Sequence, residues 1–82
     1  MSKIKVGQIY KITPSHNSMV IVYINYLTDR QESPFDMMTC IFNDGAVQCF
    51  RRIDIAGMRL LAEYPTWQEA VNSKEFNDVA ED

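Results

Sequence analysis

The sequence predicts a mainly β protein of the α+β class, either a five-stranded small barrel or a bent antiparallel sheet, with a C-terminal helix. Three observations predict this fold. Five apolar or alternating segments precede residue 65, and turn-forming residues separate them. The turn signal Asn43-Asp44-Gly45 joins two of these segments as a hairpin. A helix-capping pattern at Thr66 follows the last segment.

The predicted strands follow one another without an interdomain linker or an internal repeat. The second is dense in β-branched and aromatic residues and is apolar on both faces, which indicates a central strand covered on both sides. Residues 53–61, which overlap the end of the fourth strand and the start of the fifth, would also accommodate a helix. The predicted strands are residues 7–13, 19–27, 36–42, 46–53 and 58–64.

The composition changes at residue 65. The Thr66 hydroxyl can cap the amide of Glu69, whose carboxylate can reach back. Trp67, Ala70 and Val71 share one helical face, so we expect this helix to dock on the strands. Residues 1–64 then form the barrel and residues 65–82 a helical cap with an acidic tail, all within a single domain.

The hairpin register bears on the two cysteines. If Asp44 and Gly45 form a two-residue loop, Cys40 lies opposite Cys49 on one face. The pair is then either a redox switch or two reduced thiols that pack as small apolar groups, and the lack of a secretory signal favours the reduced form. A metal site would need two more ligands, and the chain has one histidine, so we expect no metal.

Composition restricts the class of protein. The chain has 82 residues, of which 46% are apolar and 23% charged, as is typical of one soluble globular domain. Its longest apolar run is six residues, too short to cross a membrane. The first residues lack the apolar core of a signal peptide, so we expect a cytoplasmic location.

Charge is divided unevenly along the chain, whose net charge is −3. Residues 1–62 hold seven Lys and Arg against five acids, whereas residues 63–82 hold one Lys against six acids. The acidic tail either contacts a basic partner or keeps the protein soluble. The low overall pI disfavours generic binding to phosphate backbones.

No catalytic motif is present, so we expect no enzyme and no cofactor. The three glycines are isolated and suit turns rather than a phosphate-binding loop. The single histidine, His16, lies in a polar loop, with no partner that would activate a nucleophile.

Two sets of residues are candidates for binding. Arginine beside tyrosine is typical of protein interfaces and of single-strand nucleic-acid sites, although arginine stems also simply cover apolar rims. Acidic residues of the C-terminal segment form the second set, and we expect their reversal to Lys to weaken partner binding. The two sets are Tyr23, Tyr26, Arg51, Arg52 and Arg59, and Glu69, Glu75 and Asp78.

The predicted strands carry more apolar surface than a small barrel can bury. A barrel of this size buries one face of each strand. Either the C-terminal helix or a second copy of the chain must cover the remainder, and we favour a homodimer.

Two segments resemble known proteins. Residues 62–76, Ala-Glu-Tyr-Pro-Thr-Trp-Gln-Glu-Ala-Val-Asn-Ser-Lys-Glu-Phe, resemble the tail of small uncharacterised proteins encoded by phages and prophages of Gram-positive bacteria. Val6-Gly7-Gln8-Ile9-Tyr10 and the turn at residues 42–45 resemble SH3-like small barrels. The phage resemblance implies an accessory role in the cytoplasm of a bacterial host: binding, and inhibiting, a host protein such as a defence protein.

We therefore expect a non-enzymatic interaction protein that binds a host or phage protein. The alternative is a small barrel that binds nucleic acid or a nucleotide through the arginines and tyrosines. A third possibility is a structural component that only self-assembles.

Overall fold

The structure, a computed structural model, describes residues 4–12, 17–27 and 32–77. In chain order its elements are β1 (Gln8–Lys11), β2 (Ser18–Asn25), β3 (Met37–Phe42), β4 (Val47–Arg51), α1 (Arg52–Ala56), β5 (Arg59–Glu63), α2 (Trp67–Val71) and α3 (Lys74–Asn77). Among the described residues, no helix is long and apolar enough to cross a membrane.

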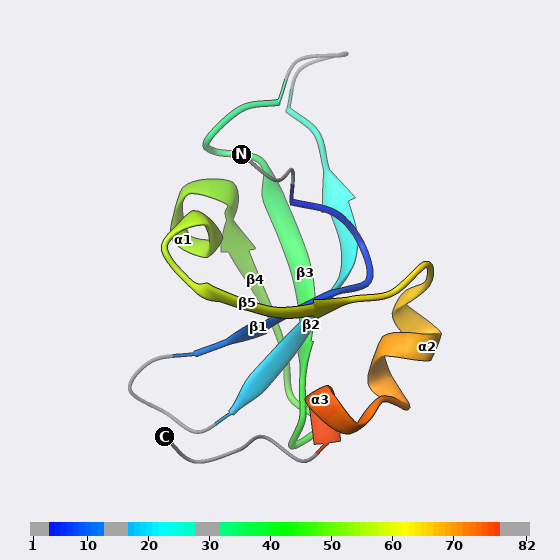
Figure 1. The fold of residues 1–82 in the computed structure, drawn as a ribbon. Helices are drawn as coiled ribbons and strands as arrows, with labels where there is room; N and C mark the ends of the chain where they lie inside the picture. The colour runs from blue at the N-terminus through cyan, green and yellow to red at the C-terminus, as the bar shows by residue number, and fades with distance from the viewer. Residues whose placement is uncertain (1–3, 13–16, 28–31, 78–82) are drawn as a thin grey trace.

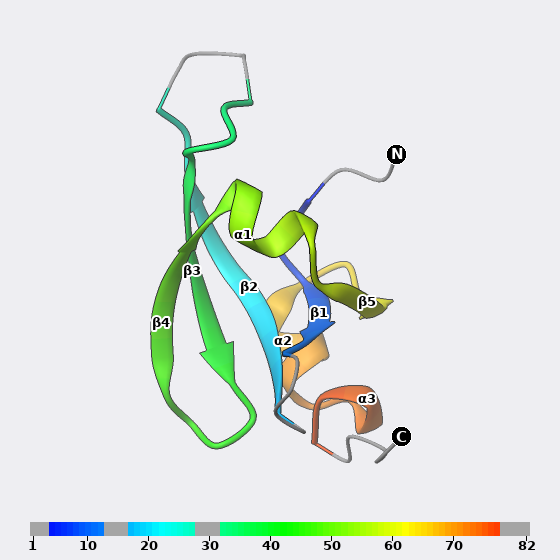
Figure 2. The ribbon, with the colours of Figure 1, turned by 90° about the vertical axis from the view of Figure 1, so that its left-hand side faces the viewer.

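The five strands form one antiparallel sheet in the order β4-β3-β2-β1-β5 (Figure 1). This confirms the mainly β fold with C-terminal helices. The sheet is bent and is not closed into a barrel, so β4 and β5 remain its two edges. Figure 2 shows α1 crossing from the β4 side to the β5 side, while α2 lies behind β1 and β2 and α3 lies below β1.

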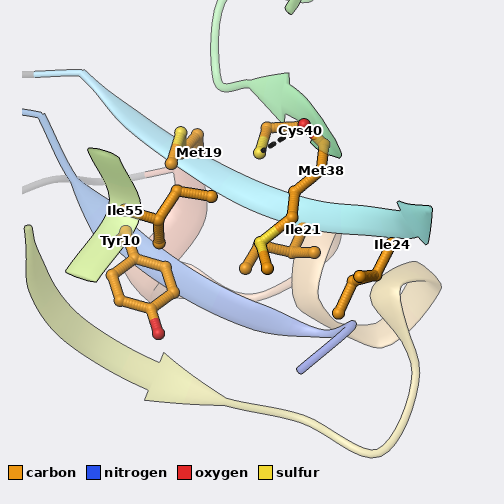
Figure 3. Packing of buried hydrophobic residues seen from close by; sticks show 7 residues of the cluster. All are labelled: Tyr10, Met19, Ile21, Ile24, Met38, Cys40 and Ile55. Atoms are coloured by element: carbon orange, nitrogen blue, oxygen red, sulfur yellow. Dashed lines mark hydrogen bonds between the residues drawn. The ribbon is translucent and has the colours of Figure 1, made fainter. Parts of the chain in front are cut away.

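The first apolar core lies on the α1 side of the sheet (Figure 3). Ile55 of α1 is fully buried and packs against side chains from β1, β2 and β3. β1 and β3 supply residues of one parity to this face, as regular strands do, whereas β2 changes parity after Ile21. The buried members of this core are Tyr10, Met19, Ile21, Ile24, Met38, Cys40 and Ile55.

The second core lies on the opposite face, under α2 and α3. Ile9 and Val20 of the sheet pack against Ala70 and Phe76 of the two helices. The Ser18 hydroxyl donates a 2.7 Å hydrogen bond to the Phe76 carbonyl and so fixes α3 on β2. The prediction that the second strand is central and covered on both sides is therefore correct for its first half.

A β-bulge at residue 22 reverses the faces of β2. Ile21 pairs with Cys40, but the next paired residue, Tyr23, opposes Thr39. One extra residue on β2 turns Tyr23 outward, where it is 59% exposed, and turns Ile24 into the first core.

The predicted register of the β3–β4 hairpin is wrong by one residue. Cys49 lies opposite Thr39, and Cys40 opposite Gln48. The loop has three residues rather than two, because the Gly45 amide bonds to the Phe42 carbonyl and Gly45 adopts a φ of +94°. A one-residue shift moves a side chain to the other face. Cys40 is therefore buried and Cys49 exposed, and the two thiols do not face each other.

The predicted fourth strand, residues 46–53, also ends earlier than expected. β4 stops at Arg51, and α1 begins at Arg52. The Asp54 carboxylate accepts the Arg51 amide at the start of this helix. The five-residue helix places Ile55 in the first core.

The start of α2 confirms the predicted cap. The Thr66 hydroxyl accepts the Glu69 amide at 3.2 Å and lies 3.1 Å from the Glu69 carboxylate. Ala70 is buried, with Trp67 and Val71 packed beside it, as the helical spacing predicts.

Gly7 connects the start of β1 to the end of β5. Its carbonyl accepts the Tyr64 amide at 3.1 Å, and its φ is +94°. A Cβ at this position would collide with the Tyr64 carbonyl oxygen. Glycine is therefore required here both for its backbone conformation and for the close approach of the two segments.

Candidate functional site

A buried ion pair joins the segment before β3 to the first turn of α1. Asp36 is fully buried, and its carboxylate lies 3.2 Å from the Arg52 guanidinium, whose side chain is 11% exposed. The same carboxylate accepts the amides of Leu27 at 2.8 Å and Ser33 at 2.9 Å. Glu32 lies 3.7 Å from the guanidinium on its outer side. One carboxylate thus holds the end of β2, the loop before β3 and the start of α1.

These bonds keep Asp36 ionised. The Leu27 amide, assisted by the Ser33 amide and Arg52, lowers the pKa of Asp36 even though burial opposes ionisation. The Arg52 guanidinium also donates to the Ser33 carbonyl at 3.2 Å and lies 5.9 Å from the centre of the Tyr26 ring. Arg52 therefore acts mainly within the protein, and its charge is largely compensated.

Exposed apolar side chains belong to residues that adjoin this ion pair. Two of them have backbone amides that are held near the ion pair. The Leu27 amide donates to the Asp36 carboxylate, and the Ile53 amide donates to the Pro34 carbonyl. Each has more than half of its surface accessible. We call this group the apolar end of the sheet; it consists of Tyr26, Leu27, Phe35 and Ile53.

The outer face of β2, β3 and β4 continues from the apolar end. Tyr23, Thr39 and Cys49 lie side by side across the three strands. Met37 precedes this row on β3, opposite Arg51, and is 37% exposed. The C-terminal helices, which cover the corresponding face of β1 and the first half of β2, are packed against Ile9 and Val20 and leave Tyr23 exposed.

The three predicted arginines do not form one cluster. Arg51 makes two contacts with Asp54, at 3.1 and 3.2 Å, and the Arg51 side chain lowers the pKa of Asp54. Arg52 is held by Asp36. Arg59 lies on β5, at the other edge of the sheet, opposite Lys11. Within the predicted set, the Arg52 guanidinium lies over the Tyr26 ring.

The predicted acidic surface has structural roles. Glu69 interacts with Thr66 at the start of α2. Glu75 accepts a 2.9 Å hydrogen bond from the Tyr64 hydroxyl, which raises the pKa of Tyr64. Asp78 lies outside the described residues. Reversing these acids would therefore disturb the cap of α2 and the attachment of α3 as well as the surface charge.

A surface hollow of about 370 Å³ lies where β1 begins and β5 ends. Its lining consists of Lys5, Val6, Gln8, Glu63, Tyr64 and Pro65. The Gln8 amide oxygen accepts the Lys5 amide and the Tyr10 hydroxyl, both at 2.8 Å, and its nitrogen donates to Glu63. Burial, with Glu63 nearby, raises the pKa of Tyr10. The buried polar groups beside the hollow are satisfied by one another, which is the pattern of a structural network.

Sequence reasoning missed Leu27, Phe35 and Ile53 as site residues. Phe35 is a large apolar residue directly after Pro34, beside a charged loop and outside the predicted strands. An aromatic residue in such a position is the one sequence signal that could have identified it as a surface residue. Nothing in the sequence pairs Asp36 with Arg52, since they are 16 positions apart and meet through the bend of the sheet.

No protein-family model matches this chain, and neither a curated protein nor a solved structure matches it. The geometry of the apolar end is therefore the basis for assigning a function.

Proposed function

We propose that this protein is a non-enzymatic interaction protein that binds another protein through the apolar end of its sheet. One observation carries the proposal: four exposed apolar side chains stand on a backbone that a buried ion pair holds in place. Contiguous exposed apolar groups on a small protein are typical of interaction sites.

The local physics favours binding at this end. Because the Asp36 carboxylate already fixes the backbone of Leu27 and Ser33, less conformational entropy is lost when a partner orders the surface. Tyrosine and phenylalanine supply large contact areas with few rotatable bonds, and aromatic anchors carry much of the energy of protein interfaces. Tyr26 and Phe35 are such anchors, since both are more than half exposed.

We propose a bacterial host protein as the partner, with the chain acting as a phage-encoded inhibitor, for instance of a defence protein. The resemblance of residues 62–76 to phage and prophage proteins supports this partner class. An inhibitor of this kind acts stoichiometrically, by covering a surface of its target, and needs no catalytic residue or cofactor.

The nucleic-acid alternative has less support. Such a site needs exposed cations beside stacking aromatic rings. Asp54 and Asp36 compensate Arg51 and Arg52, and Arg59 lies on the opposite edge strand.

Affinity capture with matched variants tests the proposal. The tagged protein, Phe35→Ser and Leu60→Ser are each incubated with a nuclease-treated lysate of a Gram-positive host. Leu60 is the control because it is also an exposed apolar residue, but lies on β5. We expect one host protein in a 1:1 ratio with the wild type and with Leu60→Ser, and its loss with Phe35→Ser.

Two results would contradict the proposal. One is a captured protein that Phe35→Ser retains fully; this would move the site elsewhere on the molecule. The other is an eluate with the tagged chain alone, together with salt-dependent binding to a fluorescent single-stranded oligonucleotide; this would establish the nucleic-acid alternative.

A further inference from the structure

The outer side of β4 offers unpaired backbone groups. The Phe42 amide bonds to the Ala46 carbonyl at 2.7 Å, so this pair is a hydrogen-bonded one. Hydrogen-bonded and non-hydrogen-bonded pairs alternate along antiparallel strands. Gln48 and Phe50 therefore direct their amides and carbonyls to β3, whereas Val47 and Cys49 direct theirs away from the sheet. Within the described residues, no element lies beyond β4 (Figure 2).

The two edges of the sheet differ in their protection. β5 carries a charged residue at each end, Arg59 and Glu63, and edge charges discourage pairing with another chain. β4 has no charge from Val47 to Phe50 and no proline. Its one charged residue, Arg51, has both its amide and its guanidinium bonded to Asp54. The backbone groups free to accept another strand are thus those of Val47 and Cys49.

We propose that the β4 strands of two copies pair antiparallel about a two-fold axis at Gln48, forming a continuous ten-stranded sheet. In this register, Val47 of each copy opposes Cys49 of the other as a hydrogen-bonded pair. Two such pairs use the outward amides and carbonyls of Val47 and Cys49. At the axis, Gln48 of one copy lies opposite Gln48 of the other, in a non-hydrogen-bonded pair. The arrangement is isologous and therefore closes as a dimer.

Side-chain chemistry matches a second copy on both faces. On the outer face, Val47, which is 60% exposed, lies beside the exposed Cys49 of the other copy. The two-fold axis repeats this contact, so the dimer buries two such pairs. On the other face, the two Gln48 amides meet as donor and acceptor, and Phe50, which is stacked on Phe42 at 6.0 Å, lies opposite the small Ala46.

Charge does not oppose pairing in this register. Arg51 of one copy is opposite Gly45 of the other, next to Asp44, whose side chain is exposed. No like charges stand opposite each other along the paired strands. A foreign strand would need this same sequence of small, apolar and amide groups, whereas a second copy supplies it by symmetry. The proposal is independent of partner binding at the apolar end, which involves other residues.

Charge substitution at the axis tests the dimer and its register together. Gln48 is exposed, so Gln48→Lys or Gln48→Glu leaves a single chain able to fold, which far-UV circular dichroism checks. Across the axis, either substitution places like charges directly opposite each other, and mixing the two variants places opposite charges there.

Sedimentation velocity over a concentration series provides the measurement. We expect the wild type to reach twice 9.5 kDa, and each single variant to dimerise about tenfold more weakly. An equimolar mixture of the two variants should regain the wild-type dissociation constant. A wild type that stays monomeric at all concentrations would overturn the proposal. So would dimers of unchanged strength in both variants, or a mixture no stronger than its components.

Discussion

The part of the sheet around β1 is packed on both faces, whereas the β3–β4 hairpin is packed mainly on one. α2 and α3 cover the outer face of β1, and Phe76, only 5% exposed, fills the space between them and the sheet. On the hairpin and the segments beside it, apolar side chains such as Phe35 and Val47 remain exposed. The difference indicates a division of roles: one half supplies stability and the other supplies surface for contacts with other chains.

Two phenylalanines measure this division most directly. Phe76→Ala removes a buried ring from the second core, so we expect the free energy of unfolding to fall by about 3–5 kcal/mol. Phe35→Ala removes a ring that is 55% exposed and should change it by no more than about 0.5 kcal/mol. Urea denaturation followed by circular dichroism gives both values. Equal losses would show that the apolar end is part of the core.

Two glycines with the same φ of +94° provide a second comparison. At Gly45 a Cβ would meet no atom, so Gly45→Ala should cost only the backbone strain, about 1–2 kcal/mol. At Gly7 a Cβ would collide with the Tyr64 carbonyl oxygen, so Gly7→Ala adds a steric clash, and we expect a loss of about 2–5 kcal/mol. The same denaturation experiment applies; a larger loss at Gly45 would contradict the close approach of β1 and β5.

The ion pair of the apolar end should appear in the pH dependence of stability. The pKa of Asp36 is lower in the folded chain than its ordinary value of 3.8, mainly because of the Leu27 amide. Its contribution is therefore fully present above about pH 3.8 and is lost as the pH falls through the lower, folded-state pKa.

Asp36→Asn tests this assignment. The variant should be less stable at neutral pH, and its stability should fall less steeply than that of the wild type below pH 3.8. Thermal unfolding at a series of pH values measures both effects. Asp54→Asn is the matched control, since the pKa of Asp54 is also lowered but its partner, Arg51, is exposed; we expect a smaller change. Parallel acid profiles for Asp36→Asn and the wild type would exclude Asp36 as the source.

The thiols give the smallest expected effect, a difference in reactivity without a change in stability. Burial raises the pKa of the Cys40 thiol to about 12, whereas Cys49 is exposed. At a chain concentration below the dissociation constant of the proposed dimer, which covers Cys49, a thiol reagent should therefore label one cysteine per folded chain quickly, and Cys49→Ser should abolish that fast phase. Rapid labelling of both cysteines would contradict the observed register of the hairpin.

Much of the fold could be predicted from local sequence. The apolar run of β2 predicts a central strand, and Thr66 with Glu69 predicts the start of α2, because both signals depend on neighbouring residues. The hairpin register could not be predicted, because Asn43-Asp44-Gly45 fits a two-residue loop as well as the three-residue loop that occurs. The sequence leaves the position of α1 open, because the residues after Arg51 alternate like a strand although residues 53–61 also accommodate a helix.

The candidate site was less predictable than the fold. Tyr23 and Tyr26 are predicted binding residues, and for the arginines the sequence leaves open both ligand binding and coverage of an apolar rim; the structure shows the tyrosines exposed and Arg51 and Arg52 compensated within the chain. Their compensation by Asp36 and Asp54 follows from one long-range contact and one local cap that no pattern reveals. The exposure of Tyr23 depends on the bulge at residue 22, because an uninterrupted strand would turn Tyr23 into the core.

The pairing of the first strand with the last has a consequence for how the chain folds during synthesis. β2, β3 and β4 follow one another along the chain, and each can pair with the next as soon as it leaves the ribosome. β1 must wait longer: Gln8 contacts Glu63, 55 positions later, and α2 packs only after that. Pairing across such a separation is slow. In the nascent chain, the edge of β1 that later pairs with β5 therefore stays unpaired until nearly the whole protein has been made.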